Sequence, residues 1–119
     1  MPRQDIYDMT FTKVYDLLVA KAERKGRTRA EVDEVTKWLT GYTDEDIAAA
    51  YKDGYTYGDF FRNMPELNPG AVLIKGSICG IKIEEIEDQL MKQIRYLDKL
   101  VDELAKGKSM EKIKRGYGN

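Results

Sequence analysis

The sequence contains no histidine and only one cysteine, Cys79. Without histidine, the chain lacks the usual general base, the usual partner of a nucleophilic serine or cysteine, and the commonest metal ligand. A single cysteine also excludes an intramolecular disulfide framework. These absences argue against an enzyme, and the sequence predicts no catalytic, cofactor-binding or metal-binding residues. An enzyme that uses carboxylates or the Cys79 thiol stays as a minor alternative.

Two features could be taken for reactive or metal-binding sites, and each has a structural explanation. Cys79 lies in Gly76-Ser77-Ile78-Cys79-Gly80, where we expect a small buried side chain in a tight turn. The densest acidic cluster precedes a long apolar stripe. We expect its carboxylates in the first turn of a helix, where unpaired N–H groups favour them, rather than around a metal ion. The cluster consists of Glu84, Glu85, Glu87 and Asp88.

Long apolar runs, a signal peptide and a lipidation motif are also lacking, which predicts a cytoplasmic protein without membrane association. A length of 119 residues predicts one helical domain over residues 1–119, with frayed ends at about 1–5 and 115–119. The net charge of −1 gives no overall attraction to nucleic acid.

The charges are nevertheless unevenly distributed. Residues 1–30 carry a net charge of +3, residues 31–60 carry −6, and residues 106–119 carry +4. If the two basic segments meet in space, they form a positive patch that could bind an anion or nucleic acid, with Tyr117 stacking on a base. Otherwise they are solvated helix ends. The candidate contacts are Arg24, Lys25, Arg27, Arg29, Lys108, Lys112, Lys114 and Arg115.

An apolar stripe over residues 84–106 predicts one long amphipathic helix that organises the fold. Its apolar residues recur at steps of three and four and fall on one helical face. They are Ile83, Ile86, Leu90, Ile94, Leu97, Val101 and Leu104. We expect shorter helices of the same chain to cover this face. Because the last positions are nearly heptad, pairing with a second copy is the alternative.

Shorter helices are predicted on both sides of this stripe. The first covers residues 10–25, and Gly26 ends it. Three more begin at Thr28, Thr43 and Thr56, each of which is followed three residues later by an acidic residue. A last one begins at Ser109. The expected apolar face of the first helix is Phe11, Val14, Tyr15, Leu17, Leu18 and Ala22.

The stretch over residues 68–83 allows two interpretations. Asn68 and Pro69 favour a helix start, with a brief helix over residues 71–74. The alternative is a β-hairpin that pairs residues 72–74 with 77–83 around Lys75 and Gly76. The predicted fold is therefore mainly α: a compact orthogonal bundle of five or six helices around one long C-terminal helix, with a minor hairpin near residues 72–83 as an open alternative. Large core residues are expected to include Trp38, Tyr15, Phe60 and Phe61.

Several irregular segments together resemble a family of short bacterial proteins, domain-of-unknown-function family 2200. The segments are IYDMTF (6–11), KAERKGRT (21–28), WLTGY (38–42), ICG (78–80) and IRYLDKLVDELAKG (94–107). The resemblance covers about residues 6–113 and leaves out residues 116–119. It implies a compact, mainly helical orthogonal bundle and a bacterial origin, and it implies no activity and no site residues.

Two functions are compatible with these observations. The first is a small non-enzymatic protein-interaction module that associates with itself or with another protein, since a charged surface without catalytic groups suits binding. The second is a nucleic-acid or anion-binding accessory protein that uses the two basic segments.

Overall fold

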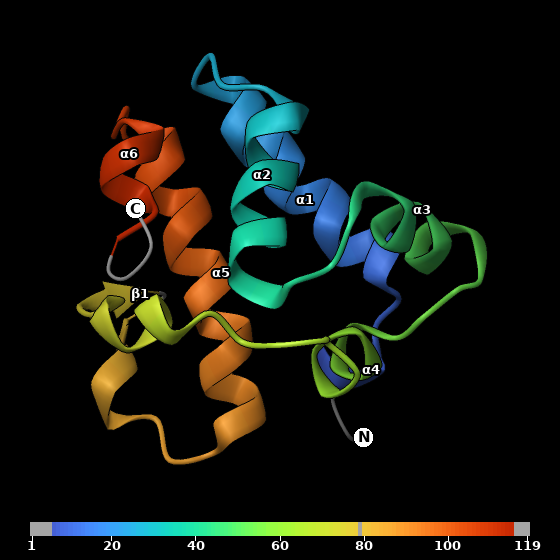
Figure 1. The fold of residues 1–119 in the computed structure, drawn as a ribbon. Coiled ribbons are helices and arrows are strands. Elements are labelled where there is room, and N and C mark those ends of the chain that lie inside the picture. The colour runs from blue at the N-terminus through green and yellow to red at the C-terminus, as the bar shows by residue number, and fades with distance from the viewer. Residues whose placement is uncertain (1–5, 79, 116–119) are drawn as a thin grey trace.

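Six α-helices, three short 3-10 helices and one small hairpin make up the described part of the computed structural model, residues 6–78 and 80–115 (Figure 1). The α-helices are α1 (Phe11–Arg24), α2 (Arg29–Thr40), α3 (Asp44–Lys52), α4 (Tyr57–Arg62), α5 (Gln89–Ala105) and α6 (Met110–Ile113). The 3-10 helices are η1 (Ile6–Asp8), η2 (Pro69–Leu73) and η3 (Ile83–Glu85), and the hairpin pairs β1 (Ser77–Ile78) with β2 (Ile81–Lys82). The predicted mainly α fold class is confirmed.

Short polar side chains set the helix starts. The predicted starts at Thr28, Thr43, Thr56 and Ser109 are confirmed, because each of these hydroxyls accepts a hydrogen bond from the backbone N–H three residues later. Such bonds satisfy N–H groups that the first helical turn leaves without a partner. At Thr28 the Glu31 carboxylate also accepts from the Thr28 N–H at 2.9 Å, which completes a capping box.

The long helix begins later than the sequence predicts. α5 starts at Gln89, and Asp88 is its N-cap, accepting from the N–H groups of Leu90 (3.0 Å) and Met91 (3.4 Å). Ile83 and Glu84 lie in η3 because local contacts hold them there. The Ile83 N–H donates to the Gly76 carbonyl at 2.9 Å, and the Glu84 carboxylate accepts from the Gly76 N–H at 3.0 Å. Of the acidic cluster, only Asp88 therefore caps the helix.

Both interpretations of residues 68–83 are partly right. Asn68 caps η2 by accepting from the Gly70 N–H at 2.7 Å, so a helical turn does follow Pro69. A hairpin also forms, but it pairs Ser77 with Lys82 and Ile78 with Ile81. The predicted pairing around Lys75 and Gly76 is wrong, because residues 69–73 are already used by η2. Cys79 lies outside the described residues, as does Tyr117.

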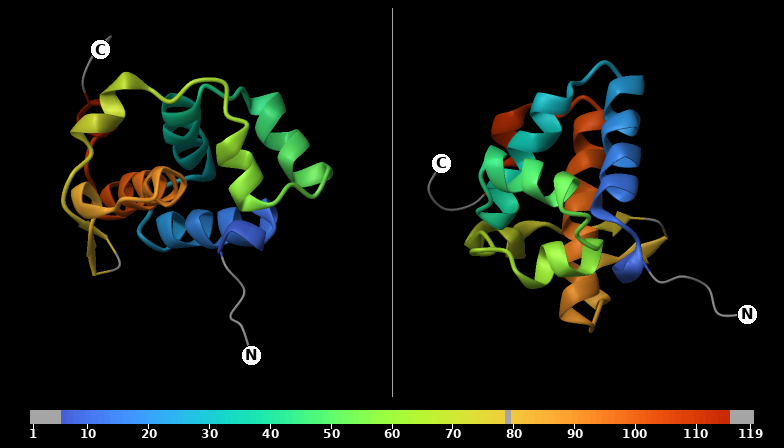
Figure 2. Two further views of the ribbon diagram at one scale, coloured as in Figure 1. Left: turned by 90° about the horizontal axis from the view of Figure 1, so that it is seen from below. Right: turned by 90° about the vertical axis from the view of Figure 1, so that its right-hand side faces the viewer.

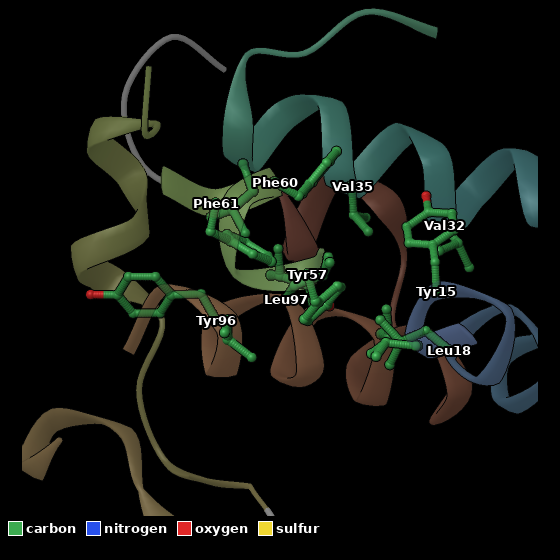
Figure 3. Packing of buried hydrophobic residues seen from close by; sticks show 14 of the residues in the cluster. Tyr15, Leu18, Val32, Val35, Tyr57, Phe60, Phe61, Tyr96 and Leu97 are labelled. Atoms are coloured by element: carbon green, nitrogen blue, oxygen red, sulfur yellow. The ribbon is translucent and has the colours of Figure 1, made fainter. Parts of the chain in front are cut away.

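The apolar face of α5 is packed within the chain. Its residues from Ile94 onward are fully buried, and α1 and α2 make the most extensive contacts with this helix (Figure 2). Its near-heptad stripe is thus covered by the chain's own helices, as expected. In Figure 3 the buried side chains of four helices converge: Tyr15, Leu18, Val32, Val35, Tyr57 and Leu97.

Aromatic rings fill the space between α1 and α4. The ring centroid of Phe11 lies 4.3 Å from that of Phe60 and 4.7 Å from that of Tyr15. The predicted burial of Tyr15, Phe60 and Phe61 is confirmed. Trp38 is only partly buried, and Leu17 is 62% exposed, so its predicted place on the core face is wrong. The helical spacing includes Leu17, but within residues 6–78 and 80–115 no other element covers that edge of α1.

Candidate anion-binding surface

The two basic segments converge at one end of the bundle, and we call residues 21–29 together with 106–115 the basic end. Arg27 joins them: its Nη1 donates to the carbonyl oxygens of Leu104 (3.1 Å) and Lys108 (2.9 Å). Figure 1 and the right-hand view of Figure 2 show the α1–α2 loop and the α5–α6 loop at the same end. The Leu104 carbonyl also accepts from the Gly107 N–H at 3.0 Å, so Arg27 supplies an additional, charged donor to the last turn of α5.

Arg27 is therefore a structural cation rather than a ligand contact. Its Nε and Nη2 donate to the Glu31 carboxylate at 3.1 Å and 2.8 Å, so its guanidinium is occupied on both edges. Hydrogen bonds from Arg27 lower the pKa of the Glu31 carboxyl below its ordinary value, which keeps the pair charged at neutral pH.

Carboxylates of the same chain neutralise most of the other cations. Glu103, which is nearly buried, pairs with Arg115 and with Lys108 (3.5 Å). Asp102 pairs with Lys21 (3.1 Å) and Lys106 (3.0 Å). Partial burial opposes its ionisation, but the two amines lower its pKa overall.

Two further predicted contacts are held against α1 and α2. Lys114 pairs with Glu34. Arg29 lies 4.0 Å from Asp16 and places its guanidinium 4.9 Å from the centre of the Tyr51 ring, in cation–π range. Both cations are therefore already engaged by groups of the same chain, and a ligand would have to compete with those groups.

Three of the predicted contacts remain available for a ligand. Arg24, Lys25 and Lys112 are exposed, and within the described structure no ion pair or hydrogen bond engages their side chains. Across the basic end, ten cations face seven carboxylates, counting the five carboxylates that pair with it from α1, α2 and α5. The basic end therefore carries a small net positive charge, concentrated at one end of the bundle.

A hollow of about 610 Å³ opens beside Lys112, between α5 and the start of α6. Four of its lining residues are lysines, namely Lys99, Lys106, Lys108 and Lys112. Lys99 was not among the predicted contacts. The sequence could have indicated Lys99, because it precedes Lys106 by seven residues and therefore lies two turns away on the same helix face. Lys99 also donates to the Ser77 carbonyl at 3.2 Å, which holds it at the edge of the hollow.

The described part of the chain shows neither a metal-binding cluster nor a membrane-spanning helix. Within residues 6–78 and 80–115, no group of three or more cysteine, aspartate or glutamate side chains is placed to hold a metal ion. Of the acidic cluster, Glu84 and Asp88 are engaged in hydrogen bonds to backbone N–H groups or to Tyr7. None of the helices in those ranges is long and apolar enough to cross a membrane.

The comparisons with known proteins agree with the fold. A family model described as an uncharacterized protein conserved in bacteria, domain-of-unknown-function 2200, matches residues 5–115. The chain is also similar to the crystal structure of the uncharacterized protein SP1917, with 51% sequence identity and a TM-score of 0.89, covering 94% of this chain and 92% of that chain. None of the curated proteins matches the sequence.

Proposed function

The chain belongs to the bacterial family of domain of unknown function 2200, and from its surface we propose that it binds a nucleic-acid phosphate backbone or a similar polyanion through the basic end. The observation that carries this proposal is the tether by Arg27, whose bonds to the Leu104 and Lys108 carbonyls bring two basic segments together. A cytoplasmic location, where nucleic acid is present, is part of the same proposal.

The charge arrangement supports a modest and salt-sensitive affinity. Three cations of the basic end, Arg24, Lys25 and Lys112, have no internal ion pair in the described structure, so they can contact phosphates without breaking the fold. Each neutralised phosphate releases counterions, and three contacts predict a slope of roughly −2 to −3 for log K against log salt concentration. The proposal rests on phosphate contacts alone and therefore includes no base specificity.

The direct test is fluorescence anisotropy of labelled single- and double-stranded oligonucleotides, titrated with the protein at low and moderate salt. Reversing the three available cations together, in R24E/K25E/K112E, should remove binding because phosphate contacts dominate such affinity. The matched control is K52E/K75E/K82E, which makes the same charge change at exposed lysines elsewhere. Equal loss in both variants would mean that only overall charge matters, and absence of binding by the native protein at low salt would refute the proposal.

Self-association is the second candidate function, and exposed apolar side chains favour it. Val72 and Leu73 of η2 are 63% and 42% exposed, whereas the stripe of α5 is covered within the chain. If the protein pairs with itself, we therefore expect η2 rather than α5 at the interface. Measurement of the solution mass against the 13.7 kDa monomer decides this. A dimer that V72D/L73D does not dissociate would contradict the assignment to η2.

A further inference from the structure

A second hollow, of about 330 Å³, lies between α1 and α5 beside the hairpin. Its size is at the lower end of the range of roughly 300–1,000 Å³ that is typical of small-molecule sites. Most of its wall is apolar, formed by Ile6, Val14, Leu17, Leu18 and Ile78. Ile81, which is 42% exposed, pairs with Ile78 across the hairpin and extends the apolar surface outward.

Leu17 is the most informative residue of this wall. Nearly all other apolar residues of α1 are buried. Leu17, on the same helix, is 62% exposed. Covering it with an apolar group would remove that surface from water, which is favourable in proportion to the area covered. The hollow beside it is thus a place where an apolar ligand gains contact without displacing any part of the fold.

Charged groups lie at the other side of the hollow. Arg95 donates from Nη1 to the Asp98 carboxylate at 2.8 Å, and their side chains are only 20% and 13% exposed. Burial raises the pKa of Asp98, against the lowering effect of Arg95. Beneath this pair the Tyr57 hydroxyl, fully buried and without a hydrogen-bond partner among the described residues, feels the charges of both groups.

The remaining two lining cations differ in their availability. Lys21 forms an ion pair with Asp102 at 3.1 Å, so its charge is already neutralised. Arg24 is exposed and no ion pair engages it in the described structure. With Arg95 and Asp98 neutralising each other, one cation is left over at the edge of an apolar hollow. That arrangement is complementary to an apolar group carrying a single negative charge.

We propose that this hollow binds a small amphiphilic monoanion of the medium-chain carboxylate class. Its chain lies against Leu17, Leu18 and Ile78, and its carboxylate lies at Arg24. This site goes beyond polyanion binding at the basic end. The two proposals share Arg24, but the apolar wall at Leu17, Leu18 and Ile78 contributes nothing to phosphate contacts, so each can hold without the other.

The test is a two-dimensional amide NMR titration of the full-length protein with octanoate, and with octylammonium and acetate as probes of charge and chain. Octanoate should shift amides around Leu17 and Ile78. Because each buried methylene favours binding by about threefold to fourfold, octanoate should bind about tenfold more tightly than hexanoate. Octylammonium should bind clearly more weakly. Equal binding of octylammonium, the same shifts with acetate, or no shifts with octanoate would each overturn the proposal.

Matched variants separate the two parts of the site. L17Q should weaken octanoate binding about fivefold through lost apolar contact, whereas V72Q, at a residue of nearly equal exposure in η2, should leave it unchanged. R24E should weaken it by about twofold to fivefold, whereas K25E at the neighbouring exposed position should not. Unchanged affinity in both L17Q and R24E would exclude this site. Oligonucleotide binding by L17Q should be unaffected, so failure here and failure of the polyanion proposal are distinguishable.

Discussion

Arg27 and Leu104 are 77 residues apart in the chain, and the Arg27 guanidinium donates a hydrogen bond of 3.1 Å to the Leu104 carbonyl oxygen. The same nitrogen reaches the Lys108 carbonyl, so one side chain from the α1–α2 loop fixes the turn between α5 and α6. Hydrogen bonds from a charged donor are stronger than neutral ones. This contact therefore both stabilises the bundle and positions the cations of the basic end.

Replacing Arg27 by alanine should destabilise the fold by about 1–3 kcal/mol, because the two carbonyls and Glu31 lose a charged partner. Urea unfolding followed by circular dichroism measures the change. The control is R24A, since Arg24 is exposed and makes no ion pair in the described structure, and it should alter stability by no more than about 0.5 kcal/mol. Equal stability of the two variants would contradict the tether.

Two fully buried tyrosines provide a second matched comparison. The Tyr15 hydroxyl donates to Asp33 at 2.6 Å and lies 3.0 Å from the Thr36 hydroxyl, whereas the Tyr57 hydroxyl has no hydrogen-bond partner among the described residues. Y15F should therefore lose about 1–2 kcal/mol of unfolding free energy, while Y57F should be neutral or slightly stabilising because it removes an unsatisfied buried group. Thermal and urea unfolding give both values. A larger loss in Y57F than in Y15F would refute the assignment of partners.

Stability should fall steeply in alkaline solution. Burial raises the pKa of Tyr15 and Tyr57 well above the ordinary value, and it raises the pKa of Tyr42 to about 12. In the unfolded chain these hydroxyls ionise near pH 10. Above that pH the folded state binds more protons than the unfolded state, so the free energy of unfolding decreases as the pH rises towards the folded pKa values.

Near-ultraviolet absorbance of tyrosinate, recorded together with circular dichroism, checks this expectation. Part of the tyrosinate signal should appear only with loss of helix. The Y15F/Y57F variant, compared with the native protein, should show a smaller fraction of signal coupled to unfolding. Complete ionisation near pH 10 with the helices intact would show that the rings are accessible in the folded state.

Leu97 and Leu17 should lose very different amounts of stability when each is replaced by alanine. Leu97 is fully buried on α5, so L97A should cost about 2–5 kcal/mol from lost apolar burial and a residual cavity. Leu17 is 62% exposed on α1, so L17A should cost less than about 1 kcal/mol. Denaturant midpoints measure both. Comparable losses would mean that Leu17 is covered in solution, and a native midpoint that rises with protein concentration, with this dependence lost in L17A, would identify a second copy as the cover.

Local rules predicted the helix starts well because each depends on neighbouring residues. Thr28 with Glu31 and Thr43 with Asp46 form capping boxes at the predicted positions, since a hydroxyl and a carboxylate three residues apart reach each other's backbone N–H groups. The start of α5 was predicted too early because periodicity alone continues back to Ile83. Hydrogen bonds of Ile83 and Glu84 with Gly76 keep these two residues out of the helix. Those hydrogen bonds form only because the hairpin brings the segments together.

The candidate site was predictable in composition but not in arrangement. Arg24, Lys25 and Lys112 were among the predicted contacts, and the structure leaves them accessible. The structure also shows that Arg27 binds the Leu104 carbonyl and that Arg115 pairs with Glu103. The sequence does not predict these contacts, because they form between segments that only the fold brings together. The hollow beside Leu17 gave no sequence signal, because the spacing of Leu17 is that of a core residue.

The sequence by itself determined the starts and caps of α2, α3, α4 and α6 and the apolar stripe of α5, because these follow from side-chain chemistry within a few residues. Within the described residues, tertiary structure alone decided which cations are paired and which are not, and that Leu17 on α1 stays exposed. Ion pairs and hollows form between segments brought together by burial of the core. Burial of the α5 stripe places α1 and α2 beside it, and that packing brings Arg27 to Leu104 while it leaves Leu17 uncovered.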